Sequence, residues 1–303
     1  MDLLRVLAES PPLFIGVCLA LGLLVGSFLN VVIYRLPVML EREWRAECAD
    51  LCGDARASSA DAKAEPEKFN LIVPRSACPK CKAPITALQN IPVVSYLFLK
   101  GKCAACGVRI PARYPFVEAL TGVLSAAVAW KLGFGWPVVC ALLLTWYLVA
   151  LTFIDIDHQL LPDNLTLPLM WLGIFASLWG PAAGAPLPVD LRSSVLGALA
   201  GYLSLWTVYH VFRLLTGKEG MGYGDFKLFA ALGAWLGWKM LLPIILIAAL
   251  VGAVTGIVIL SRKKLGHETP ISFGPFLAAA GWLVLMFGNE LVERYLSLYT
   301  HHP

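Results

Sequence analysis

Long hydrophobic runs alternate with short polar segments along almost the whole chain. A helix needs about 20 consecutive apolar residues to cross the hydrocarbon core of a bilayer. The pattern therefore predicts an all-α polytopic membrane protein with about eight transmembrane helices. The predicted spans are 12–35, 115–134, 137–154, 163–180, 193–214, 226–238, 241–260 and 271–288. The run 226–238 is the shortest and gives the weakest indication of a separate span.

One long polar region, residues 36–114, interrupts this pattern. It divides the chain into a first transmembrane helix at 1–35, a polar insertion at 36–114 and a group of spans at 115–303. The first run lacks the basic n-region and the small-residue cleavage site of a signal peptide, and it is too long for the apolar h-region. We therefore expect it to be a retained span.

The composition agrees with a membrane protein. Hydrophobic residues make up 58% of the chain and charged residues 15%, whereas soluble globular domains have about 45–50% apolar and about 25% charged residues. This excludes an ordinary soluble enzyme or a highly charged nucleic-acid-binding domain, and we expect no nucleic-acid partner.

The basic residues indicate how the spans are oriented. With eight spans, the connections 36–114, 155–162, 215–225 and 261–270 and the helix ends beside them carry 19 of the 24 Lys and Arg residues. Loops rich in Lys and Arg stay in the cytoplasm. The distribution therefore predicts that these connections are cytoplasmic and that both termini lie on the outer side of the membrane.

Four cysteines in the polar insertion form two C-x-x-C pairs, Cys78 with Cys81 and Cys103 with Cys106. Two such pairs about 20 residues apart are a strong indication of a zinc site. Four thiolates complete a tetrahedral shell and leave no open position, so the predicted Zn²⁺ is structural rather than catalytic. The alternative is a redox role or four unliganded thiols, but the cytoplasm keeps thiols reduced, which favours metal over a disulfide.

The remaining cysteines carry no such pattern. Cys48 and Cys52 share a helix face by their spacing, yet no second pair accompanies them, and we interpret them as thiols without a function. The segment 53–68 is small and charged and is typical of a linker. Cys18 and Cys140 lie within apolar runs and are expected to be packing residues.

Two acidic residues lie at ends of apolar runs, and both ends fall on the predicted cytoplasmic side. Asp155 directly follows the apolar run that ends at Ile154, and Asp225 follows Gly222-Tyr-Gly224. Acids at membrane depth are costly and usually functional. Two carboxylates on different helices can share one proton and activate a water, which is the chemistry of an aspartic protease. The glycines permit a positive φ that would aim Asp225; the alternative is that Asp225 caps the helix that follows.

Neighbouring polar residues have simpler interpretations. Asp157 is two residues after Asp155, about 200° away around a helix, so the two cannot face one partner; we expect Asp157 to be exposed. His158 is expected to be a surface group, and Asp163 to start the next helix. Asn30 and Arg35 lie near the inner end of the first span, where Arg35 can extend to the interface.

Taken together, these motifs resemble the bacterial type IV prepilin peptidases, which are bifunctional leader peptidases and N-methyltransferases. The resemblance covers nearly the whole chain. It rests on Gly26-Ser-Phe-Leu-Asn30 with Tyr34-Arg35-Leu-Pro, both C-x-x-C pairs, Arg113-Tyr-Pro with Glu118, Asp155-Ile-Asp157-His-Gln-Leu-Leu-Pro-Asp163, and Lys218-Glu-Gly-Met-Gly-Tyr-Gly-Asp225-Phe-Lys227.

The resemblance implies a membrane aspartic endopeptidase of the bacterial inner membrane with catalytic Asp155 and Asp225. Its protein substrates would be type IV prepilins and pseudopilins, cut after a short basic leader at the cytoplasmic face. It also implies N-methylation of the new N-terminus by S-adenosylmethionine, with Gly26, Asn30, Arg35 and Glu118 as the expected donor-site residues. On this interpretation 36–114 is a cytoplasmic zinc-binding domain and 115–303 a transmembrane aspartyl peptidase core.

Two other functions remain open from the residues alone. An intramembrane aspartyl protease that cuts within transmembrane helices would also need paired acids. A proton-coupled transporter can use membrane acids as a relay, although such proteins often contain internal repeats and none is evident here.

Overall fold

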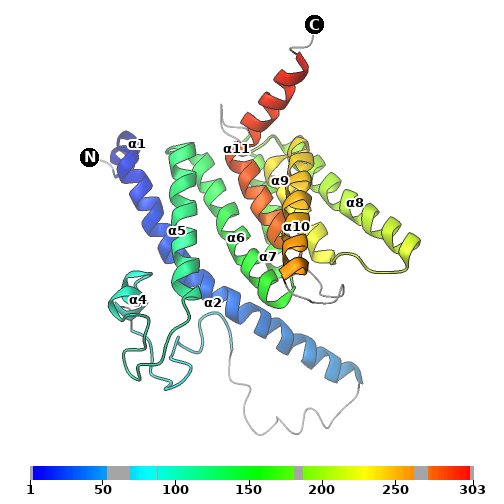
Figure 1. Cartoon of the computed structure of the whole chain (residues 1–303). Coiled ribbons are helices and arrows are strands. Elements are labelled where there is room, and N and C mark those ends of the chain that lie inside the picture. Colours follow the sequence, from blue (N-terminus) through cyan, green and yellow to red (C-terminus); the bar gives the residue numbers. More distant parts are fainter. Residues whose placement is uncertain (1–2, 53–68, 87, 181–186, 263–271, 301–303) are drawn as a thin grey trace. The chain divides into compact units, whose positions relative to one another are not determined.

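The computed structural model describes residues 3–52, 69–86, 88–180, 187–262 and 272–300 (Figure 1). Within these ranges the chain is helical, and its only extended pairings are two isolated β-bridges. This confirms the all-α prediction. The predicted linker 53–68 lies outside the described residues. The helices are α1 (Leu3–Glu9), α2 (Pro11–Cys52), η1 (Leu88–Asn90), α4 (Val94–Phe98), α5 (Arg113–Leu132), α6 (Trp136–His158), α7 (Asp163–Ser177), α8 (Leu191–Thr216), α9 (Tyr223–Leu236), η2 (Trp238–Met240), α10 (Leu241–Arg262) and α11 (Gly274–Thr300).

Every predicted span falls on a helix, but the helices differ in length. Among the described residues, five helical segments are long and apolar enough to cross a membrane: Pro11–Leu51, Arg113–Leu132, Trp136–His158, Leu191–Thr216 and Trp238–Val258. Helices α7 and α9 have 15 and 14 residues. At 1.5 Å per residue they reach only about 21–23 Å, less than the hydrocarbon thickness of about 30 Å. The number of eight complete spans therefore stays a prediction.

Helix α2, which contains the first predicted span, is longer than its apolar run. Helix α2 continues from Pro11 to Cys52 and contains Pro37, whereas the predicted first segment ends at 35. Its C-terminal part carries Arg42, Arg45 and acidic residues, including an Arg45–Glu41 ion pair with an N–O distance of 2.6 Å. Local helix propensity and i,i+4 pairing extend the helix where hydrophobicity no longer does. A boundary drawn from hydrophobicity marks the end of the apolar run and not the end of the helix.

The chain forms two compact units: residues 1–16 with 125–303, and residues 17–124. In the first, α9 is the central helix, packed by α7, α8, α10 and α11. Apart from Lys227, every residue from Asp225 to Leu236 is buried. The short helix α9 is thus the core of this unit, and this burial explains why α9 is apolar. Its composition does not require that α9 cross the bilayer by itself.

Glycines allow α8 and α9 to approach closely. A Cβ placed on Gly197 would lie 2.1 Å from the carbonyl oxygen of Gly233, and one on Gly201 would lie 2.7 Å from that of Phe229. Only residues without a side chain fit such a contact between backbones. The glycines at 197 and 201 therefore serve helix packing.

In the second unit, α2 packs against the start of α5 through another glycine. A Cβ on Gly26 would lie 2.7 Å from the Cα of Glu118. Cys18 is buried in this packing, as expected from its apolar run. The close contact brings the predicted residue Glu118 next to Gly26.

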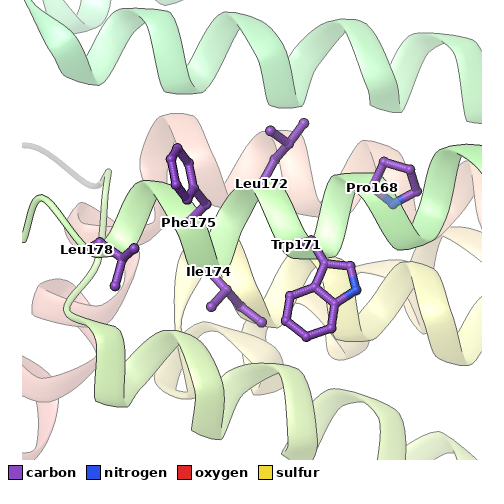
Figure 2. A pocket seen from close by; sticks show the side chains of 6 residues that line it. All are labelled: Pro168, Trp171, Leu172, Ile174, Phe175 and Leu178. Atoms are coloured by element: carbon purple, nitrogen blue, oxygen red, sulfur yellow. The ribbon is translucent and has the colours of Figure 1, made fainter.

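An apolar pocket lies along α7 and is shown in Figure 2. It is lined by Pro168, Trp171, Leu172, Ile174, Phe175 and Leu178. Neither an acid nor a cysteine contributes to the lining, so the pocket cannot supply acid–base chemistry. Trp171, Phe175 and Leu178 are more than half exposed, as expected of side chains that face lipid.

Candidate active site and metal centre

Asp155 lies in the last turn of α6, and its side chain is buried, with 4% of its surface exposed. The helix ends at His158 because Gln159 adopts a left-handed conformation with φ 51°, and its N–H donates to the Asp155 carbonyl. Asp157 and His158 point outward and are exposed. The two acids of the Asp-x-Asp pair therefore differ as the helical period predicts, and only Asp155 enters the protein interior.

Asp225 is also buried, with 7% of its surface exposed. It is the third residue of α9, and the N-cap is Gly222. The Asp225 carboxylate accepts a hydrogen bond from the Gly222 N–H, which resembles the reciprocal half of a capping box. The alternative interpretation, that Asp225 is the N-cap, is therefore wrong by three residues, because the helix begins before the acid.

The reason for the two glycines also differs from the prediction. Gly222 has φ −81°, and neither it nor Gly224 is among the residues with positive φ. Instead, a Cβ on Gly224 would lie 2.7 Å from the Cβ of Leu161. Position 224 has no side chain because Leu161 packs directly against the backbone beside Asp225. The turn does not need a residue with a left-handed conformation there.

The fold brings the two acids together. Asp155 and Asp225 are close enough to repel each other electrostatically. Leu161 links their surroundings, since it contacts the backbone at Gly224 and its Cδ1 would lie 3.1 Å from a Cβ on Gly274, beside Asp155. The structure thus places two buried carboxylates from different helices near one another, which is the arrangement expected for a shared proton.

Ser272 and Gly274 are part of this site, although the sequence did not point to them. The Ser272 hydroxyl donates to Oδ2 of Asp155, and the Gly274 N–H donates to the same carboxylate. The only available signal was their position at the start of the last predicted run, 271–288, where a serine is most simply interpreted as a helix cap.

Polar and aromatic contacts hold the start of α9 in place. The Lys227 ammonium lies 2.6 Å and 2.7 Å from the two carboxylate oxygens of Asp163, the first residue of α7 as predicted. On the other side, the rings of Tyr223 and Phe226 pack on Tyr209 of α8, with centroids 5.3 Å and 5.6 Å away. These contacts fix the turn that carries Asp225.

The four predicted cysteine ligands converge. The sulfur atoms of Cys78, Cys81, Cys103 and Cys106 all lie within 4.8 Å of one another, and those of Cys78 and Cys106 are 3.8 Å apart. Sulfurs bound tetrahedrally at about 2.3 Å from zinc are separated by about 3.8 Å. The geometry therefore fits the predicted metal.

The two cysteine pairs have the same backbone fold. The N–H of Cys78 donates to the Ala83 carbonyl over 2.9 Å, and the N–H of Cys103 donates to Val108 over 2.8 Å. One residue after each pair the chain turns through a left-handed residue: Lys82 with φ 59° in the first and Gly107 with φ 68° in the second. Two equivalent knuckles thus present two sulfurs each.

Two of the four thiols have shifted pKa values. Backbone N–H groups of Cys81 and Lys80 lower the pKa of Cys78 to about 6. The Val108 N–H lowers the pKa of Cys106, but desolvation and hydrogen bonds to the other three thiols outweigh it and raise that pKa to about 11. Without a cation the cluster resists full ionisation, because four thiolates at this spacing repel one another. A divalent ion removes this conflict.

The predicted donor-site residues lie on α2 and α5 within one compact unit. One Glu118 oxygen accepts the Val93 N–H over 2.8 Å, and the Ser27 hydroxyl contacts the same carboxylate. The Asn30 amide donates to the Tyr114 carbonyl over 3.0 Å. Gly26, Asn30 and Glu118 therefore cluster where the two helices meet.

Arg35 has a different environment. It is buried, with 7% exposed, and its two terminal nitrogens donate to the carbonyls of Asn70 and Pro74 over 2.8 Å and 2.6 Å. The guanidinium also lies over the Phe69 ring, 5.7 Å from its centroid. Arg35 therefore does not extend to the membrane interface. Its hydrogen bonds hold the segment that contains Asn70 and Pro74, just before Cys78, against α2.

The sequence also matches models of known protein families. Residues 20–132 match the bacterial peptidase A24 N-terminal domain, and residues 142–257 match the type IV leader peptidase family. No solved structure matches the chain.

Similar proteins named prepilin leader peptidase/N-methyltransferase occur in several bacteria. That of Aeromonas salmonicida is 53% identical, over 98% of this chain and 99% of its own. Those of Pseudomonas aeruginosa and Neisseria gonorrhoeae are 50% and 48% identical, each over 98% of both chains. With this identity over nearly the full length, the chain belongs to the type IV leader peptidase family.

Proposed function

We propose that this protein is a membrane aspartic endopeptidase that removes the leader of type IV prepilins and pseudopilins and then methylates the new N-terminal residue. The observation that carries the proposal is the pair of buried carboxylates, Asp155 of α6 and Asp225 of α9, which lie close enough to repel each other. The family relationship and the names of the relatives support the choice of substrate.

The cleavage chemistry follows from two neighbouring carboxyl groups. Two acids this close resist joint ionisation, so one keeps a proton. The ionised carboxylate takes a proton from a water, which attacks the scissile carbonyl. The protonated one donates to the carbonyl oxygen, and a proton then passes to the leaving amine. Burial removes competing water and strengthens both interactions.

A direct test of the function uses purified protein in detergent and a synthetic prepilin. We expect a single cut at the leader boundary, followed by methylation of the new N-terminus when S-adenosylmethionine is added. A cut within the transmembrane segment would instead indicate a general intramembrane protease. No cleavage, with proton-driven transport after reconstitution, would indicate a transporter.

We further propose a structural Zn²⁺ held by Cys78, Cys81, Cys103 and Cys106. The convergence of the four sulfurs supports it. With four protein ligands, the ion has no open position for a substrate. Its role would be to hold the two knuckles together, within the proposed cytoplasmic zinc-binding domain 36–114 that separates the first helix 1–35 from the peptidase core 115–303.

For methyl transfer, we propose a donor site around Gly26, Asn30 and Glu118, with Arg35 supporting it through the segment it binds. S-adenosylmethionine would supply the methyl group on a positively charged sulfur. The Glu118 carboxylate suits the ribose hydroxyls or the positive charge of such a donor. The clustering of these residues at the α2–α5 contact supports the choice.

Exchanging Glu118 for Gln should separate the two activities. Glu118→Gln keeps the shape but loses the charge, so methylation should fall by about 10- to 100-fold, the loss typical of a hydrogen bond to a charged group. Leader cleavage should stay within about twofold. Both rates can be read by mass spectrometry of the pilin product.

A pair of glycine variants on α2 gives the matched control. Gly26→Ala introduces a Cβ only 2.7 Å from the Cα of Glu118, whereas Gly16→Ala meets nothing within 4 Å. Only the first should impair methylation. If Glu118→Gln and Gly26→Ala lose cleavage and methylation together, the role of this contact is structural and the donor site lies elsewhere.

We also propose an inner-membrane location with both termini in the periplasm, supported by the excess of Lys and Arg on the opposite side. Cys48 is exposed on α2, and Arg192 is exposed near the start of α8. A membrane-impermeant maleimide added to cells with a permeabilised outer membrane should label an Arg192→Cys variant at residue 192 but not at Cys48. Labelling of Cys48 alone would reverse the topology.

A further inference from the structure

The N-terminal end of α11 lies directly against the Asp155 side chain. The Ser272 hydroxyl donates to Oδ2 of Asp155, and the N–H of Gly274, the first residue of α11, donates to the same carboxylate. A Cβ on Gly274 would lie only 2.2 Å from Oδ2. Ser272, 117 residues away from the acid in sequence, and the first residue of α11 therefore contact Asp155 through two hydrogen-bond donors.

These donors constrain how Asp155 can be oriented. A backbone N–H can only donate, so the oxygen it contacts must present a lone pair toward α11. The Ser272 hydroxyl has a single hydrogen, and that hydrogen is used on Asp155. Two bonds, one from the first residue of α11 and one from Ser272 just before it, hold the rotation and the position of the carboxyl group. A carboxyl group without such partners rotates easily about its last bond.

The contact is not explained as ordinary capping of α11. A serine before a helix usually stabilises that helix by accepting its free N–H groups. Here the hydroxyl hydrogen goes to a buried acid of another helix. The absence of a side chain at Gly274 is likewise required by Asp155 and not by its own helix, since glycine weakens a helix.

We propose that Ser272 is a positioning residue for leader cleavage: with the Gly274 N–H, it holds the Asp155 carboxylate in the orientation that faces Asp225 and the scissile bond. The inference rests on the proposed peptidase function. It makes α11 a part of the active site, although α11 supplies no acid to it.

The first test removes the hydroxyl. Ser272→Ala should lower kcat for prepilin cleavage by about 10- to 100-fold, the loss expected for one hydrogen bond to a charged group, with KM within about twofold because substrate binding is not touched. Ser272→Thr retains a hydroxyl and should recover most of the rate. Ser177→Ala removes another buried hydroxyl, bonded within its own helix to Ile174, and should leave kcat unchanged.

The second test adds a methyl group at the contact. Gly274→Ala places a Cβ only 2.2 Å from Oδ2 of Asp155 and should lower kcat at least as much as Ser272→Ala. Gly252→Ala is the matched control in α10, because its nearest neighbour, the Phe276 ring, is 3.4 Å away, an ordinary contact. Methylation of a synthetic pilin that already lacks its leader reports on folding, and it should persist in all these variants.

The results separate this inference from the proposed function. Wild-type protein that does not cleave prepilin overturns the function and the inference with it. If the wild type cleaves and Ser272→Ala or Gly274→Ala cleaves at the normal rate, only the positioning role is overturned. The positioning role is also overturned if Ser272→Thr cleaves as slowly as Ser272→Ala while it methylates leaderless pilin normally. It is likewise overturned if Ser272→Ala and Gly274→Ala both lose methylation of leaderless pilin.

Discussion

Replacing either buried acid by its amide should abolish leader cleavage in a protein that remains folded. Asp155→Asn or Asp225→Asn keeps the side-chain shape but removes the group that holds or releases a proton. The rate should fall by roughly 10³- to 10⁴-fold, the upper end of the range for general acid–base catalysis. Single-turnover cleavage of a prepilin, followed by mass spectrometry, measures this loss.

The structure supplies a control two residues away. Asp157 belongs to the same helix turn as Asp155 but is exposed, so Asp157→Asn should change the rate by no more than about twofold, as for most surface substitutions. Melting temperatures in detergent should stay close to the wild-type value for all three variants. If Asp157→Asn abolishes cleavage while Asp155→Asn leaves it intact, the wrong member of the pair has been assigned.

Loss of one zinc ligand should unfold the cysteine module. Metal affinity contributes directly to folding in such small sites, by about 10–16 kcal/mol in isolated zinc-finger peptides. Cys81 and Cys106 are exposed, so Cys81→Ser and Cys106→Ser remove a ligand without opening a cavity in the core. We expect about one zinc per chain in the wild type and almost none in either variant, with rapid proteolysis between residues 69 and 112.

Cys48 provides the matched comparison for this second prediction. It is also an exposed thiol, but it lies on α2 and is not in the cluster of four sulfurs. Cys48→Ser should keep the zinc content and the protease resistance of the wild type. Elemental analysis that finds no zinc in the wild type, or full zinc in Cys106→Ser, would show that the four thiols do not hold this metal.

Several features could be predicted because they depend on local patterns. Apolar runs locate the helices, since a helix in a bilayer must be apolar over most of its length. The spacing of Cys78 with Cys81 is fixed by the knuckle that two ligands need. The helical period separates Asp155 from Asp157, and the structure indeed buries one and exposes the other.

Other features depend on contacts between distant residues, and these could not be predicted. Hydrophobicity could not show that α2 continues to Cys52, because its last turns are polar and rely on helix propensity. The sequence also could not show that Gly224 makes room for Leu161, since a glycine before an acid suggests a tight turn equally well.

The helical membrane class, the cysteine cluster and the two acids could be identified from residue types, because apolar runs, C-x-x-C pairs and acids at the ends of apolar runs are local patterns. Their surroundings depend on how the helices pack: Arg35 donates to the carbonyls of Asn70 and Pro74, and Ser272 donates to Asp155. A hydroxyl or a guanidinium can bond to many partners, and packing of helices far apart in the chain selects the one it meets.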